Sequence, residues 1–118
     1  MRAPSGVDHD EQVQMYKFVN MNIYVGITDI TALKAEAIVN AANGLLQYKA
    51  GLALDISRAA GPDLHTEGQN IIRRNGVVST CGNVVTTGGN QPCHSVIHVV
   101  EPEEKITEIM NTVYKPYR

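Results

Sequence analysis

The chain has 118 residues, of which 43% are hydrophobic and 19% charged, which suits a single soluble globular domain with one core. Its formal net charge of −2 leaves no basic surplus for phosphate contacts, so no direct nucleic-acid binding is expected. No apolar run is long enough to span a membrane, so no membrane partner is expected. The two cysteines lack metal-ligand spacing, which favours reduced thiols in a cytoplasmic or nuclear protein.

The N-terminal part begins with polar residues that show no periodic apolar face. We therefore expect residues 1–15 to form a flexible leader and residues 16–118 to form the domain. Apolar and polar residues alternate over 21–27, which predicts a strand. The following segment Thr28-Asp29-Ile30-Thr31 is typical of a turn or a helix cap.

Residues 36–61 have the pattern of a strand, a polar loop and a helix. A short apolar run over 37–40 predicts a central buried strand, and apolar residues at helical spacing predict a helix over 52–60. Asn40 and Asn43 lie between them, where open α/β sheets bind anions and hydroxylated ligands. The alternative is that both asparagines only satisfy the backbone of a turn.

The rest of the chain continues the alternation of helices and strands. We expect a helix over 63–74, strands over 84–86 and 95–100, and a hairpin-like turn between these strands. His98 is expected as a hydrogen-bonded core histidine and not as a ligand. Glu101 begins a last predicted helix, whose apolar face consists of Ile106, Ile109, Met110 and Val113.

Four ordered blocks give the chain a family resemblance. The central one is Val39-Asn40-Ala41-Ala42-Asn43, and the others are Asp29-Ile30-Thr31, Arg58-Ala59-Ala60-Gly61-Pro62 and Val96-Ile97-His98-Val99-Val100. Together they resemble the macrodomain family, which binds ADP-ribose, and they are most similar to the tandem macrodomains of large ADP-ribosyltransferases. The resemblance implies a three-layer α/β/α fold with a mixed sheet.

The resemblance also implies a ligand and its binding residues. Asp29 and the backbone of Ile30 would bind adenine, Asn43 the distal ribose, and the backbone of Ala50, Gly51 and Leu52 the diphosphate. Asn40 would brace the loop. The ligand would be ADP-ribose, free or attached to a protein, and neither a cofactor nor a metal is expected.

Three features depart from the family pattern. In the family a glycine usually precedes the aspartate directly, whereas two residues separate Gly26 from Asp29 here. The phosphate loop of the family usually ends in consecutive glycines, of which only Gly51 is present in this chain. Ala53 stands where hydrolases of the family carry an acid, and Asp55 lies about 200° away around the helix. Complete macrodomains continue with further strands, a second phosphate loop and a final helix, so the resemblance implies a truncated, incomplete domain.

These departures favour a non-catalytic reader of ADP-ribose. The alternatives are a hydrolase that removes ADP-ribose from proteins, and an inert fragment that acts only in protein interaction. In a truncated domain an exposed apolar sheet edge favours self-association or instability.

Overall fold

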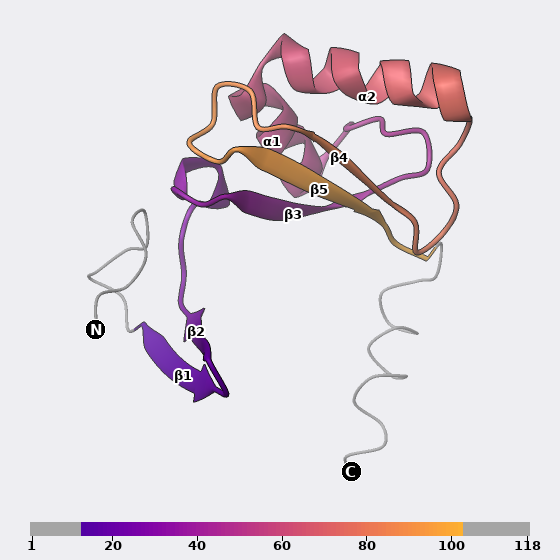
Figure 1. The fold of residues 1–118 in the computed structure, drawn as a ribbon. Helices are drawn as coiled ribbons and strands as arrows, with labels where there is room; N and C mark the ends of the chain where they lie inside the picture. Colours follow the sequence, from indigo (N-terminus) through magenta and orange to yellow (C-terminus); the bar gives the residue numbers. More distant parts are fainter. Residues whose placement is uncertain (1–12, 103–118) are drawn as a thin grey trace.

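The computed structural model describes residues 13–102, and its centre is a three-stranded mixed sheet (Figure 1). The strands β3 (Ala37–Ala42), β5 (Ser95–Val100) and β4 (Asn83–Thr87) lie side by side in this order. β5 runs parallel to β3 and antiparallel to β4. The carboxyl ends of β3 and β5 therefore meet at one edge of the sheet.

Two helices cover one face of this sheet. Figure 1 shows α1 (Gly51–Ala60) and α2 (Pro62–Asn75) on the same side of the strands. Burial alternates along β3 and β5, as expected for strands with one covered face. The core between the layers consists of Ile38, Ala42, Leu46, Tyr48, Ile56, Ala60, Leu64, Cys93 and Val96.

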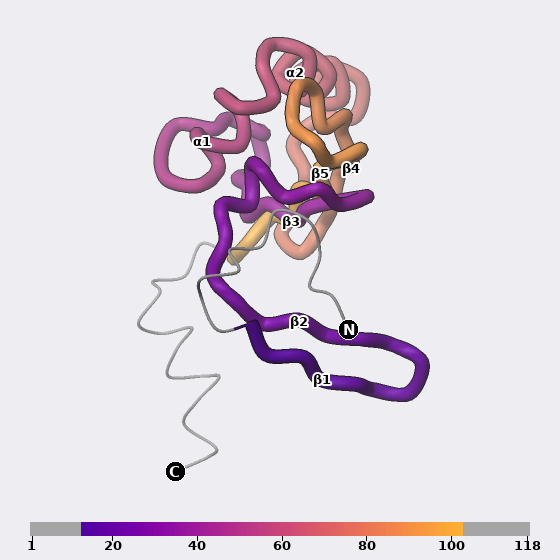
Figure 2. The backbone as a smooth tube through the Cα atoms, turned by 90° about the vertical axis from the view of Figure 1, so that its left-hand side faces the viewer, coloured from indigo at the N-terminus to yellow at the C-terminus, as the bar shows by residue number. Residues whose placement is uncertain are grey.

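The N-terminal strands form a separate hairpin. β1 (Gln14–Phe18) and β2 (Met21–Val25) pair antiparallel as a two-stranded sheet, which lies away from the two helices (Figure 2). The strand predicted over 21–27 is confirmed, but it ends two residues early. Strand β1 was not predicted, because all five of its residues are exposed and give no alternation between a buried and an open face.

Local signals in the sequence explain the helix ends. Gly61, at φ +84°, donates its N–H to the Ser57 carbonyl at the end of α1, and Pro62 begins α2 without needing an N–H of its own. Gly76 ends α2 in the same way, through Ile72. Both predicted helices are confirmed within one residue at each end.

The predicted α/β fold with a mixed sheet is confirmed, as is the hairpin-like turn between β4 and β5. Strand β3 is two residues longer than predicted and ends at Ala42. The last predicted helix begins at Glu101, but Glu101 and Pro102 are not helical, and the rest of it falls on residues 103–118, outside the described part of the chain. Over residues 13–102, neither helix is long and apolar enough to cross a membrane.

Candidate functional site

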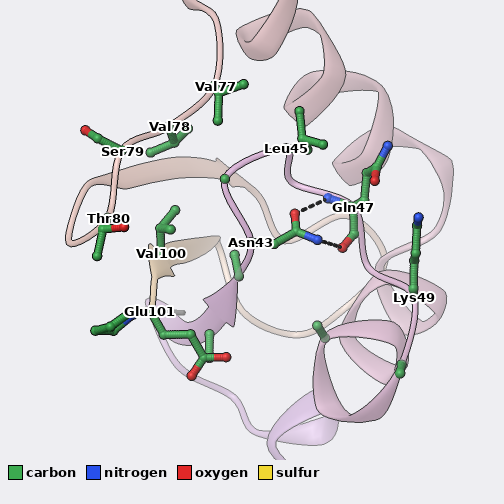
Figure 3. A pocket seen from close by; sticks show the side chains of 16 residues that line it. Asn43, Leu45, Gln47, Lys49, Val77, Val78, Ser79, Thr80, Val100 and Glu101 are labelled. Atoms are coloured by element: carbon green, nitrogen blue, oxygen red, sulfur yellow. Dashed lines mark hydrogen bonds between the residues drawn. The ribbon is translucent and has the colours of Figure 1, made fainter. Parts of the chain in front are cut away.

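A cavity of about 1000 Å³ lies at the carboxyl ends of β3 and β5 (Figure 3). Three segments line it: the connection from β3 to α1, the connection from α2 to β4, and the end of β5. The lining residues fall in 41–45, 77–80 and 100–102, with Gln47, Lys49, Ala50 and Ala53. This is the edge of an open α/β sheet at which ligands bind.

The pairing of the strands determines which side chains meet at this edge. Ala42 pairs with Val100, so Asn43 and Glu101 are the first residues beyond the paired strands. The N–H of Val78 donates to the Gly44 carbonyl over 2.8 Å and closes one wall of the cavity. A Cβ atom at Gly44 would lie 2.7 Å from the Val78 carbonyl oxygen, so this approach requires glycine.

Asn43 has two roles in this geometry. Its Nδ2 donates to the Gln47 carbonyl over 3.0 Å and its Oδ1 accepts from the Gln47 N–H over 2.9 Å, as the dashed lines in Figure 3 show. Asn43 thus satisfies the backbone of the turn, as the alternative prediction proposed. The same side chain lines the cavity and keeps one N–H and one lone pair for a ligand. Its contact with a ribose stays a prediction.

Asn40 lies inside β3 and is 1% exposed. Its Nδ2 lies 3.1 Å from His98 Nδ1, and the Tyr48 hydroxyl of the following loop lies 3.3 Å from the same nitrogen. The Thr86 hydroxyl lies 2.9 Å from His98 Nε2. The core-histidine prediction is confirmed. Asn40 reaches the loop through the His98 ring and not by direct contact, because the longer β3 places it within the sheet.

Burial determines the charge of this polar core. It lowers the pKa of His98 to about 4 and raises the pKa of Tyr48 to about 12. Both side chains are therefore neutral near pH 7. The cluster is a neutral, hydrogen-bonded part of the core and supplies no charge to the cavity.

The start of α1 forms another wall. Ala50 precedes the helix in extended conformation, with no side-chain cap, and Gly51 has φ +62°. The N–H groups of a first helical turn have no intrahelical partner, which leaves them for an anion. Ala50 and Ala53 line the cavity, whereas Gly51, Leu52 and Asp55 are not among its lining residues in the described part.

Asp29 and Ile30 lie outside the cavity lining. Asp29 Oδ1 accepts from the Thr31 hydroxyl over 2.7 Å and from the Thr31 N–H over 3.0 Å, and these bonds lower the pKa of the carboxyl. The residue thus caps the 3₁₀ helix η1 (Ile30–Ala32), which contacts α1. Ile30 packs against the core. Asp29 is therefore a helix cap, as the alternative prediction proposed. Its contact with adenine stays a prediction.

Two groups of cavity residues were not identified from the sequence. Glu101 follows β5 as Asn43 follows β3, so the strand-end rule that selected Asn43 also selects Glu101 once the two strands are known to be parallel neighbours. Residues 77–80 carry no such signal. They reach the cavity because the Val78–Gly44 hydrogen bond brings together segments distant in the sequence.

Comparison with curated proteins gives partial matches. The chain is 44% identical over 80 residues to the O-acetyl-ADP-ribose deacetylase of Escherichia fergusonii, which covers 68% of this chain and 45% of that protein. It is 35% identical over 86 residues to the human protein mono-ADP-ribosyltransferase PARP14, which covers 73% of this chain and 5% of that protein. Apart from such long proteins, the chain spans about half the length of the curated relatives it matches.

A solved structure supports the same assignment. A variant of the Oceanobacillus iheyensis macrodomain, solved with ADPR, superimposes with a TM-score of 0.75 at 28% identity and covers 90% of this chain and 61% of that chain. The model of the Macro domain family matches residues 39–115, a segment that includes the described cavity lining. The chain therefore belongs to the Macro domain family.

Proposed function

We propose that this chain is a non-catalytic binding module for ADP-ribose, free or attached to a protein. One observation carries the proposal: Asn43, the exposed Lys49 and Ala50 at the start of α1 line one cavity at the carboxyl ends of two parallel strands. Hydrogen-bonding groups for sugar hydroxyls and positive potential for an anion occur in one space.

The diphosphate is assigned to the start of α1. A helix of ten residues has a positive N-terminal end, and the backbone of Ala50, Gly51 and Leu52 provides the N–H groups. Lys49 adds a charge, with no ion-pair partner among residues 13–102. Because Gly51 has open space around its Cα, the chain there can approach a ligand closely.

The two ends of the ligand are assigned on either side of this diphosphate. The distal ribose contacts Asn43, whose orientation depends on Gln47. Adenine contacts Asp29 and Ile30, because η1 lies next to α1 and Asp29 uses only Oδ1 in its cap. Asn40 takes no direct part and supports the loop through His98 and Tyr48. The ADPR in the structure of the Oceanobacillus iheyensis macrodomain variant supports the choice of ADP-ribose as the ligand.

Hydrolysis is the second candidate function, because the E. fergusonii relative is named a deacetylase. The wall formed by α1 carries a methyl group at Ala53, and Asp55 is exposed outside the cavity lining in the described part. A missing acid or water-positioning group typically lowers a rate by about 10²–10⁴-fold. We therefore favour binding without turnover.

A cytoplasmic or nuclear location fits the free thiols of Cys81 and Cys93.

Calorimetry with ADP-ribose tests the proposal most directly. We expect ADP-ribose to bind the purified chain saturably. We expect the Asp29→Ala variant to discriminate less than the wild type between ADP-ribose and other nucleoside diphosphate sugars. The chain should release no labelled ADP-ribose from a mono-ADP-ribosylated protein, with an active macrodomain as positive control. Absence of binding heat supports the inert-fragment alternative, and release comparable to the control supports the hydrolase.

A further inference from the structure

Among residues 13–102, Glu101 is the one residue with a carboxylate that lines the cavity, and the proposed contacts with adenine, diphosphate and ribose do not use it. We propose that Glu101 accepts hydrogen bonds from the vicinal hydroxyls of the distal ribose, and thereby makes the cavity select ADP-ribose over ADP. This inference rests on the proposed function and extends it to the specificity of the same site.

The backbone fixes Glu101 beside Asn43. The two residues follow the paired positions Ala42 and Val100 of parallel neighbours, and the Glu101 N–H lies 3.4 Å from the Ala42 carbonyl. Both side chains line one cavity. Figure 3 shows the Glu101 carboxylate beneath the end of β5, on the side of Asn43 opposite to Lys49. A sugar bound at Asn43 is therefore next to Glu101.

The carboxylate is available for a ligand. Within residues 13–102, the Glu101 side chain makes no hydrogen bond and no ion pair, and it is exposed to the cavity. An ionised carboxylate only accepts hydrogen bonds, and its two oxygens match the two donors of a vicinal diol. Hydrogen bonds from a hydroxyl to a carboxylate are short and about twice as strong as neutral ones.

The distribution of charge favours one direction of the ligand. Lys49 and the N-terminal end of α1 give the first wall a positive potential, whereas Glu101 makes the β5 wall negative. A diphosphate is attracted to the first wall and repelled by the second. The uncharged hydroxylated end of the ligand is thus directed toward Glu101, which gives the carboxylate a role in orientation as well as in binding.

The test compares ADP-ribose with ADP, which lacks the distal ribose, by calorimetry on the wild type and Glu101→Gln. The amide loses the charge and one of two acceptors, so we expect the Kd for ADP-ribose to rise about tenfold and the Kd for ADP to stay within about twofold. Glu36→Gln is the matched control, because it removes the same charge at the amino end of β3, away from the cavity lining.

A second measurement changes the ligand. An ADP-ribose analogue whose distal ribose lacks one of the two hydroxyls should bind the wild type about tenfold more weakly than ADP-ribose, and this difference should shrink in Glu101→Gln. Equal affinity of the wild type for ADP-ribose and for the analogue overturns the inference. An equal loss of affinity for ADP-ribose and for ADP in Glu101→Gln also overturns it. A wild type that binds none of these ligands rejects the proposed function itself.

Discussion

The Asn43 side chain joins loop structure to ligand recognition, since one amide holds Gln47 and faces the cavity. We expect Asn43→Ala to weaken ADP-ribose binding by about 1–3 kcal/mol, because ribose hydroxyls lose a partner in a partly desolvated space. Calorimetry measures this loss. Asn70→Ala, an exposed change on α2, is the control and should leave affinity unchanged. Unaltered affinity in folded Asn43→Ala would reject the pocket assignment.

His98 makes folding depend on pH, because it is fully buried and its pKa falls from 6.5 to about 4. The unfolded chain binds a proton more readily than the folded chain between these values. The stability that neutral His98 contributes is therefore complete above about pH 6.5 and decreases as the pH falls toward 4, by a total of about 3 kcal/mol. Below pH 4 this contribution is lost. Urea unfolding at a series of pH values measures the slope.

Two variants separate His98 from the other titrating groups. His98→Gln should be less stable near pH 7, since it disrupts the contacts with Asn40, Tyr48 and Thr86, but its stability should depend less on pH between 6.5 and 4. His94→Gln, on an exposed side chain, should keep the wild-type slope. The same slope in all three proteins would show that the buried ring does not cause the pH dependence.

At the scale of elements, the sequence predicted what depends on local pattern. β3, β5, α1 and α2 follow from apolar runs, helical spacing and the glycines that end the helices. The approach of residues 77–80 to the cavity depends on one long-range hydrogen bond, from Val78 to Gly44, and no local pattern encodes it. Likewise, Glu101 could be identified as a cavity residue only once β3 and β5 were known to be parallel neighbours.

The turn between β4 and β5 contains a close contact that the Gly-Gly sequence alone did not reveal. Gly89 has φ +61°, and a Cβ atom there would lie 2.2 Å from the Ala60 carbonyl oxygen at the end of α1. The next N–H, that of Asn90, donates to the same oxygen over 2.9 Å. The glycine thus lets the turn dock against the helix.

Gly89→Ala should therefore destabilise the fold by roughly 2–4 kcal/mol, the combined effect of a left-handed alanine and a steric clash. Gly51→Ala is the matched control, because Gly51 has nearly the same positive φ, +62°, but open space where its Cβ would lie. We expect this control to lose only about 1 kcal/mol. Thermal or urea unfolding measures both, and equal losses would show that the contact with Ala60 is unimportant.

At the scale of the whole molecule, the central sheet within residues 13–102 has one face covered by α1 and α2 and one open face that no helix of this part covers. Val39 and Val85 both pair with Ile97 in the strand register, so the three side chains form a row across β3, β5 and β4. Val39 is 59% exposed and Val85 52% exposed. Exposed apolar surface of this kind is a typical site of association between proteins.

The row predicts self-association through the open face of the sheet. Replacing Val39 and Val85 together by lysine places two like charges there, and should shift the chain toward the monomer in sedimentation at high protein concentration. Val25→Lys, on a residue of β2 that is 53% exposed and outside the row, should leave association as in the wild type. Surface changes alter folding stability by only about 0.5 kcal/mol, so unfolding does not account for the expected shift. If the double variant and the wild type sediment alike, the open face does not mediate association, and contacts elsewhere on the chain become the surfaces to test.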